Sequence, residues 1–129
     1  METMSVPKTI MVVDDDPDVV DILTAILEAE GYDAVGTARS RDALRAMKHQ
    51  HPDLLLLDIM MPEMDGFEVL RHMKADPETE GIPVIAVTAR TRTSPKMIGP
   101  NVAECQEYVM KPFGNKELID KIRGIIGAP

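Results

Sequence analysis

The chain has 129 residues, 44% hydrophobic and 28% charged, which indicates one soluble globular domain with an aliphatic core, because aromatic residues make up only 3%. The formal net charge of −8, without any run of lysine and arginine, argues against a nucleic-acid partner. A single cysteine excludes an internal disulfide. With neither a signal-peptide pattern nor an apolar run of membrane-spanning length, we expect a cytoplasmic protein with no membrane partner.

The chain begins with a short apolar run followed by a helical pattern. Residues 10–13 are continuously apolar and stop at acidic residues, which predicts a buried strand. Asp16 then has the character of an N-cap, with Pro17 at the first helical position and Gly31 as the C-terminal stop. Between them, apolar residues recur at helical spacing: Val19, Val20, Ile22, Leu23, Ile26 and Leu27.

The alternation continues through the middle of the chain. Residues 33–37 predict a second strand. We expect Ser40 to cap a helix that runs to about Lys48 and buries Ala43, Leu44 and Met47. Residues 54–57 are four consecutive leucines, which predict a third buried strand ended by Asp58.

Two further strands and two further helices are predicted after a loop rich in methionine. Gly66 opens a helix whose apolar positions are Phe67, Val69, Leu70 and Met73. Residues 84–87 form a fourth strand ended by a threonine, and residues 108–110 form a fifth ended by a lysine. The last helix starts near Gly114 or Asn115 and is expected to bury Leu118, Ile119, Ile122, Ile125 and Ile126.

Near-continuous apolar strands that alternate with amphipathic helices are typical of a parallel sheet covered on both faces. Five such β–α units predict a doubly wound α/β domain, which would occupy residues 1–129 with a core at about 8–126. In open sheets of this kind, ligands bind outside the carboxyl ends of the strands. The residues directly after each strand are therefore the candidates for a site.

At those positions stand Asp14, Asp15, Asp58, Thr88 and Lys111. Three carboxylates at one edge repel each other, and a cation would compensate them. Hard oxygen ligands in this number suit Mg²⁺, which shares its coordination with phosphoryl oxygens. Thr88 would donate a hydrogen bond to a phosphoryl group and Lys111 would neutralise it. The predicted chemistry is attack of a carboxylate on phosphorus, which leaves an acyl phosphate.

Four segments of the sequence resemble the receiver domains of two-component response regulators. They are VVDDDP at 12–17, LDIMMPEMDG at 57–66, VTA at 87–89 and YVMKPF at 108–113. The resemblance extends from about residue 8 to 126, and four motifs in this order are together highly specific. It implies a flavodoxin-like strand order 2-1-3-4-5 and a chemotaxis-type single-domain regulator.

The resemblance also implies roles for individual residues. Asp58 would accept the phosphoryl group from a phosphohistidine of a sensor histidine kinase or a phosphotransfer protein. Asp15, Asp58 and the backbone carbonyl of Met60 would bind Mg²⁺ directly, and Asp14 largely through water. Thr88 and Lys111 would hold the phosphoryl oxygens.

Three further features follow from the same resemblance. Tyr108 matches the switch aromatic, which turns inward when Thr88 moves toward the phosphoryl group. The peptide bond between Lys111 and Pro112 would be cis. The region of the fourth helix, fifth strand and fifth helix would bind a downstream protein, the domain being a monomer or a phosphorylation-dependent dimer.

The segment between the fourth and fifth strands departs from the family pattern. Pro95, Gly99 and Pro100 interrupt the expected fourth helix, and Glu104 stands near the position of a usual glycine. Because a proline inside a helix costs about 3 kcal/mol, we expect a short or broken fourth helix. Unbroken amide protection from residue 93 to 104 would contradict that expectation.

Two other functions remain open at this point. One is a degenerate receiver that binds partners without phosphorylation, which the interrupted fourth helix leaves possible. The other is a phosphohydrolase of the haloacid dehalogenase type, because Asp14-x-Asp16 superficially matches the nucleophile motif of that family. That motif needs threonine or valine where Asp18 stands, so a non-enzymatic signalling switch is preferred.

Overall fold

The computed structural model describes residues 7–58, 66–89, 107–111 and 114–129. For Ser40, Phe67, Thr88, Ala89, Tyr108, Met110 and Lys111 it describes the backbone alone. Three predictions lie outside the described residues: the Met60 carbonyl, the interrupted fourth helix, and the cis bond before Pro112.

The five predicted strands form one parallel sheet in the order β2-β1-β3-β4-β5, which confirms the predicted fold class and strand order. Each strand begins and ends within two residues of its predicted bounds. The strands are β1 (Thr9–Val13), β2 (Asp33–Thr37), β3 (Leu54–Asp58), β4 (Val84–Ala89) and β5 (Glu107–Lys111).

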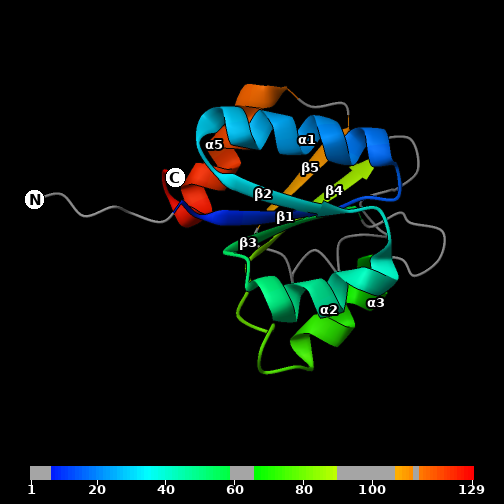
Figure 1. Ribbon diagram of the computed structural model, residues 1–129. Coiled ribbons are helices and arrows are strands. Elements are labelled where there is room, and N and C mark those ends of the chain that lie inside the picture. The colour runs from blue at the N-terminus through cyan, green and yellow to red at the C-terminus, as the bar shows by residue number, and fades with distance from the viewer. Residues whose placement is uncertain (1–6, 59–65, 90–106, 112–113) are drawn as a thin grey trace, which may run out of the picture.

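Helices cover both faces of this sheet (Figure 1). On one face lie α1 (Pro17–Glu30) and α5 (Asn115–Ile126), and on the other lie α2 (Ser40–Gln50) and α3 (Gly66–Lys74). Among the residues described, none of the helices combines the length and the apolar character that a bilayer crossing requires.

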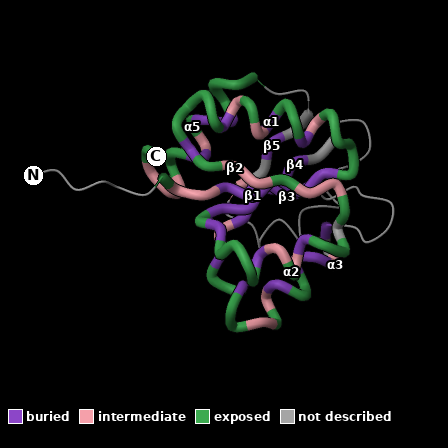
Figure 2. Tube along the Cα trace, viewed as in Figure 1, coloured by how far each residue is buried: buried purple, intermediate pink, exposed green. Residues whose placement is uncertain are grey.

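The sheet separates two hydrophobic clusters, which explains why its central strands are continuously apolar. Because successive side chains of a strand point to opposite faces, Ile10 and Val12 pack beneath α1 and α5, whereas Met11 and Val13 pack toward α2 and α3. The four leucines of β3 divide in the same way. Figure 2 shows β1 and β3 buried along most of their length.

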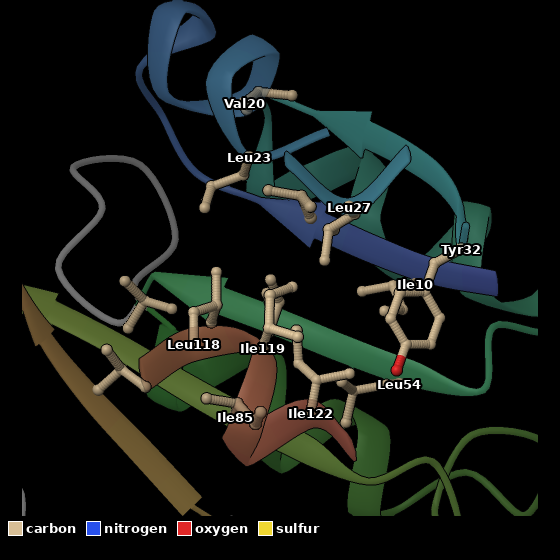
Figure 3. Close-up of a cluster of buried hydrophobic side chains, with 14 residues drawn as sticks. Ile10, Val20, Leu23, Leu27, Tyr32, Leu54, Ile85, Leu118, Ile119 and Ile122 are labelled. Atoms are coloured by element: carbon tan, nitrogen blue, oxygen red, sulfur yellow. The ribbon is translucent and has the colours of Figure 1, made fainter. Parts of the chain in front are cut away.

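The larger cluster fills the space between the sheet and the pair α1 and α5 (Figure 3). Leu23 and Leu27 of α1 point toward the sheet, and Leu118, Ile119 and Ile122 of α5 point toward the same space. Ile125 and Ile126 are only partly buried, so of the five predicted residues of α5 the first three, Leu118, Ile119 and Ile122, are buried in the core.

The ends of α1 are those that the sequence predicts. The Asp16 carboxylate accepts a hydrogen bond from the Asp18 amide at 3.0 Å, and Pro17 is the first helical residue. Gly31 adopts a left-handed φ of 104°, and its N–H donates to carbonyls of the last turn. The N-cap at Asp16 fixes where the helix begins relative to Asp14 and Asp15.

The predicted start of α2 is wrong by one residue. Ser40 is the first helical residue, and Arg39 is the N-cap, with extended φ and ψ of −123° and 118°. The reason is local: the Thr37 hydroxyl accepts a hydrogen bond from the Arg39 amide at 3.2 Å, which keeps Arg39 extended. The Arg39 carbonyl then accepts from the Asp42 amide at 3.1 Å and begins the helix.

Candidate acidic site at the carboxyl ends of the strands

Parallel pairing brings the acidic residues that follow β1 to the residue that ends β3. Val13 pairs with Leu57, so Asp14 and Asp58 lie at equivalent positions at the same edge of the sheet. Asp15 is the next residue along the chain, and Asp16 then caps α1. The site is therefore positioned by two buried central strands and one helix start.

The three predicted carboxylates converge. One oxygen of each of Asp14, Asp15 and Asp58 lies within 4.8 Å of the others. Asp14 and Asp58 are buried, at 2% and 5% exposure, whereas Asp15 is exposed. Two of the three carboxylates have thus lost most of their contact with water, and the third faces the solvent.

Two backbone contacts hold Asp14 in place, and sequence reasoning did not predict either of them. The Asp14 carboxylate accepts a hydrogen bond from the Asp16 amide at 3.0 Å, and the Asp14 amide donates to the Thr37 carbonyl at 3.3 Å. An aspartate that accepts from the amide two residues later is a common turn, so the Asp-x-Asp-Pro spacing carried a signal for the first contact.

This arrangement has the chemical character of a site for a hard divalent cation. Like charges at such separations repel, and the repulsion is stronger where burial lowers the effective dielectric constant. A magnesium ion prefers carboxylate oxygens, keeps several waters, and needs only one or two protein carboxylates in direct contact. The donor set and its partial exposure fit that preference.

Thr88 and Lys111 lie at the same edge of the sheet as far as their backbones are concerned. Asp58 pairs with Val87 of β4, so Thr88 is one residue beyond that pair. Ala89 pairs with Lys111 at the end of β5. The structure describes no side chain for either residue, nor for Tyr108, whose backbone lies within β5 opposite Ala86.

Comparisons with known proteins agree with this architecture. The family profile of the response regulator receiver domain matches residues 10–123. A curated relative, the DNA-binding response regulator MtrA of Mycolicibacterium smegmatis, is 41% identical over 123 residues, which are 95% of this chain and 51% of the relative. The chain thus spans about half the length of the curated relatives it matches.

Two solved structures are similar over almost their full length. The N-terminal domain of a response regulator receiver protein from Methanoculleus marisnigri is 36% identical with a TM-score of 0.74, over 94% of this chain and 98% of that one. The receiver domain of sensor histidine kinase PA1611 from Pseudomonas aeruginosa is 28% identical with a TM-score of 0.84, over 95% and 100%. That structure has a magnesium ion coordinated in its active-site cleft.

A five-stranded doubly wound sheet with three carboxylates at its carboxyl edge is the architecture of a phosphoacceptor domain. This chain belongs to the response regulator receiver domain family, as its sequence resemblance predicted. It is a signalling domain of two-component systems.

Proposed function

We propose that Asp58 is the residue that accepts the phosphoryl group, and that Asp14, Asp15 and Asp58 hold Mg²⁺ together with the backbone carbonyl of Met60. The observation that carries this proposal is the position of Asp58. It ends β3, whose five residues are all buried, beside two other carboxylates, and one of its oxygens lies within 4.8 Å of theirs.

The reaction is a transfer between two nucleophiles. A carboxylate oxygen of Asp58 attacks the phosphorus of a phosphohistidine, the phosphorus–nitrogen bond breaks, and the imidazole leaves as a neutral base after taking a proton. When bound, Mg²⁺ neutralises charge on the phosphoryl oxygens and orients them. Because Asp58 is buried and fixed at a strand end, little of its freedom is lost when it reacts.

The neighbouring strands would supply the remaining contacts. Thr88 would donate its hydroxyl to one phosphoryl oxygen, and Lys111 would place an ammonium against another. Their backbone positions at the ends of β4 and β5 support these roles, since both strands end at the same edge of the sheet as Asp58. Tyr108, within β5, would be the switch aromatic that responds to Thr88.

The partners are part of the same proposal. The donor would be a sensor histidine kinase or a phosphotransfer protein in the cytoplasm. The target would bind through the region that includes β5 and α5, and the chain would act as one receiver domain, monomeric or dimerising on phosphorylation. Its role would be that of a switch without turnover of a separate substrate. The MtrA relatives are named as DNA-binding, and direct DNA binding by this chain is not included.

Intact mass measurement after incubation with acetyl phosphate and Mg²⁺ tests the proposal. We expect a single phosphoryl adduct on the unaltered chain and none on Asp58→Asn. Asp42→Asn, which removes an exposed carboxylate of α2, is the matched control and should keep the adduct. An adduct that persists in Asp58→Asn would place the acceptor elsewhere, and no adduct on any variant would favour a phosphorylation-independent binding module.

A further inference from the structure

The turn between β2 and α2 borders the acidic site through a backbone contact at the end of β2. Val13 pairs with Thr37, and the amide of the next residue, Asp14, donates to the Thr37 carbonyl at 3.3 Å. Thr37 is the last residue of β2, so its carbonyl belongs both to the sheet and to the turn that follows. The position of this carbonyl therefore bears directly on the backbone of Asp14.

The side chain of Thr37 points toward the helical layer that contains α2. Side chains alternate along a strand, so Thr37 shares a face with Val35, which packs against the cluster of α2 and α3. Gly36 lies between them and faces Val20 of α1 on the other side of the sheet. Thr37 is half-buried in this position. Its hydroxyl is therefore close to the residues that begin α2.

The Thr37 hydroxyl makes two contacts with the same residue. It accepts a hydrogen bond from the Arg39 amide at 3.2 Å and donates one to the Arg39 carbonyl at 3.4 Å. A hydroxyl that bonds the backbone two residues later holds the chain in a compact turn. The Arg39 carbonyl also accepts from the Asp42 amide at 3.1 Å, which joins this turn to the first turn of α2.

Arg39 cannot close this turn with its own side chain. A guanidinium group has five N–H donors and no acceptor, so Arg39 offers no side-chain cap to the amides at the start of α2. The Thr37 hydroxyl instead connects the strand end to the helix start. Its removal would take the acceptor from the Arg39 amide and allow the turn, with the Thr37 carbonyl, to shift.

Asp14 is held from two directions. Its amide is bound by Thr37 at the end of β2, and its carboxylate accepts from the Asp16 amide at 3.0 Å at the start of α1. The first contact sets where the backbone of Asp14 lies, and the second sets how its side chain is turned. Because Asp14 is buried in a close-packed region, a shifted backbone would carry the carboxylate with it.

We propose that Thr37 is a positioning residue of the acidic site. Its hydroxyl fixes the β2–α2 turn, and the turn keeps the Thr37 carbonyl where it holds Asp14, whose carboxylate then converges with those of Asp15 and Asp58. The inference rests on the proposed function in one respect, which is that Asp14 takes part in holding Mg²⁺. Groups that orient a metal ligand without touching the metal change its affinity when they are replaced.

Two substitutions separate the hydroxyl from the bulk of the side chain. Thr37→Val keeps the branched shape and removes the hydroxyl, whereas Thr37→Ser keeps the hydroxyl and removes the methyl group. Thr24→Val is the matched control, because the Thr24 hydroxyl also donates to a backbone carbonyl, that of Asp21 at 3.0 Å, but within α1. If Thr37→Val does not fold, Thr37→Ala removes the hydroxyl without adding a methyl group and takes its place in each comparison.

The first measurement is the affinity for Mg²⁺, from the rise of each variant's melting temperature with Mg²⁺ concentration. We expect Thr37→Val to raise the dissociation constant roughly threefold to tenfold, the equivalent of one net hydrogen bond. Thr37→Ser and Thr24→Val should bind as the unaltered chain does. With acetyl phosphate, Thr37→Val should need more Mg²⁺ to reach half of its maximal rate, while the maximal rate at saturating Mg²⁺ is retained.

The second measurement is amide exchange in the metal-free protein, which depends on neither phosphorylation nor metal. The Asp14 amide should exchange roughly fivefold faster or more in Thr37→Val and at the original rate in Thr37→Ser and Thr24→Val. The amides of Met11 and Val12 report any general loss of stability and should stay protected. Faster exchange confined to the first turn of α2, with Asp14 and the Mg²⁺ affinity unchanged, would make Thr37 a helix cap only and overturn the proposal.

The outcomes also separate this inference from the proposed function. An unaltered chain whose melting temperature does not rise with Mg²⁺ would refute the metal site, and this inference with it. A rise that is the same in Thr37→Val and the unaltered chain would refute the inference alone. Equal losses of affinity in Thr37→Val and Thr37→Ser would assign the effect to packing around the side chain, and would overturn the role of the hydroxyl as well.

Discussion

Asp14 and Asp15 are neighbours in the sequence, but the fold gives them different surroundings. Asp14 is buried and accepts the Asp16 amide, so its replacement would disturb the helix start as well as any bound metal. Asp15 is exposed and no backbone contact depends on its carboxylate within the described part of the chain. Asp15 is therefore the better position at which to measure the contribution of one carboxylate to metal binding.

We expect Asp15→Asn to weaken Mg²⁺ binding by about tenfold or more, because one of three converging anionic oxygens is lost. The measurement is the rise of the melting temperature with Mg²⁺ concentration, since a ligand that binds only the folded state stabilises it by mass action. Asp18→Asn removes a nearby exposed carboxylate of α1 and should leave the curve unchanged. Identical curves for Asp15→Asn and the unaltered chain would remove Asp15 from the ligand set.

The residues of this site were predictable because one topological rule locates them. Parallel strands end at one edge, so the acids after β1 and at the end of β3 had to meet once the strands were recognised. Their unequal burial was not predictable. Nor was the contact at the end of β2, where the Thr37 carbonyl accepts the Asp14 amide, because it joins residues far apart in the sequence.

At the scale of elements, the contact between α1 and β2 depends on a glycine. A β-carbon on Gly36 would clash with the Cγ1 atom of Val20, a buried residue of α1. Atoms cannot approach so closely, so any side chain at position 36 has to push α1 away from the sheet or force Val20 to move. The absence of a side chain at Gly36 thus sets the distance between helix and strand.

We expect Gly36→Ala to lower the free energy of unfolding by about 1–3 kcal/mol, as is typical of overpacked cores. Adding Val20→Ala should recover part of that loss, so the double variant is more stable than the sum of the single effects by at least about 0.5 kcal/mol. Gly124→Ala is the control. A β-carbon there meets nothing within 4 Å, and alanine should stabilise α5 by up to about 1 kcal/mol. Denaturant titration measures the unfolding free energies of Gly36→Ala, Val20→Ala, their double variant and Gly124→Ala. Strictly additive effects of the substitutions at Gly36 and Val20 would show that the two side chains do not clash.

Local sequence signals predicted the helices and strands, but they did not predict the contacts between these elements. Asp16, Pro17 and Gly31 each act within one turn of their own helix, and each was identified correctly. Ser40 was taken for a cap because the sequence does not show that the Thr37 hydroxyl accepts the Arg39 amide and keeps Arg39 extended. Ile22 belongs to the same helical pattern as Leu23 and Ile26, and the pattern did not predict that its side chain would be 59% exposed.

At the scale of the whole molecule, the residue before β1 and the residues after α5 lie close together, and the α1–β2 turn contacts the segment after α5. The Tyr32 hydroxyl donates to the Gly127 carbonyl at 2.7 Å, and the Lys8 ammonium donates to the Ala128 carbonyl at 3.0 Å. Tyr32 is only 2% exposed and belongs to the larger hydrophobic cluster. Backbone carbonyls give no residue-specific pattern, so no sequence rule predicted this closure.

Replacing Tyr32 with phenylalanine removes one hydrogen bond and keeps the ring in the core. We expect Tyr32→Phe to lower the free energy of unfolding by about 1 kcal/mol at neutral pH, since the Gly127 carbonyl loses its donor. Faster amide exchange at the end of α5, with exchange in α2 and α3 unchanged, would identify the closure as the cause. Unchanged exchange at the end of α5 would show that the Tyr32 hydroxyl does not hold that segment.

The same variant has a pH dependence whose sign follows from burial. Burial raises the pKa of Tyr32 above its ordinary value of 10.0, against an opposing hydrogen bond from Arg123, so the folded protein keeps the phenolic proton to a higher pH than the unfolded chain. The contribution of Tyr32 to stability is therefore fully present below pH 10.0 and is lost as the pH rises from there through the folded-state pKa. Tyr32→Phe has no such loss. The gap in unfolding free energy between the two proteins should accordingly narrow above pH 10.0, and a gap that stays constant or widens there would contradict this assignment.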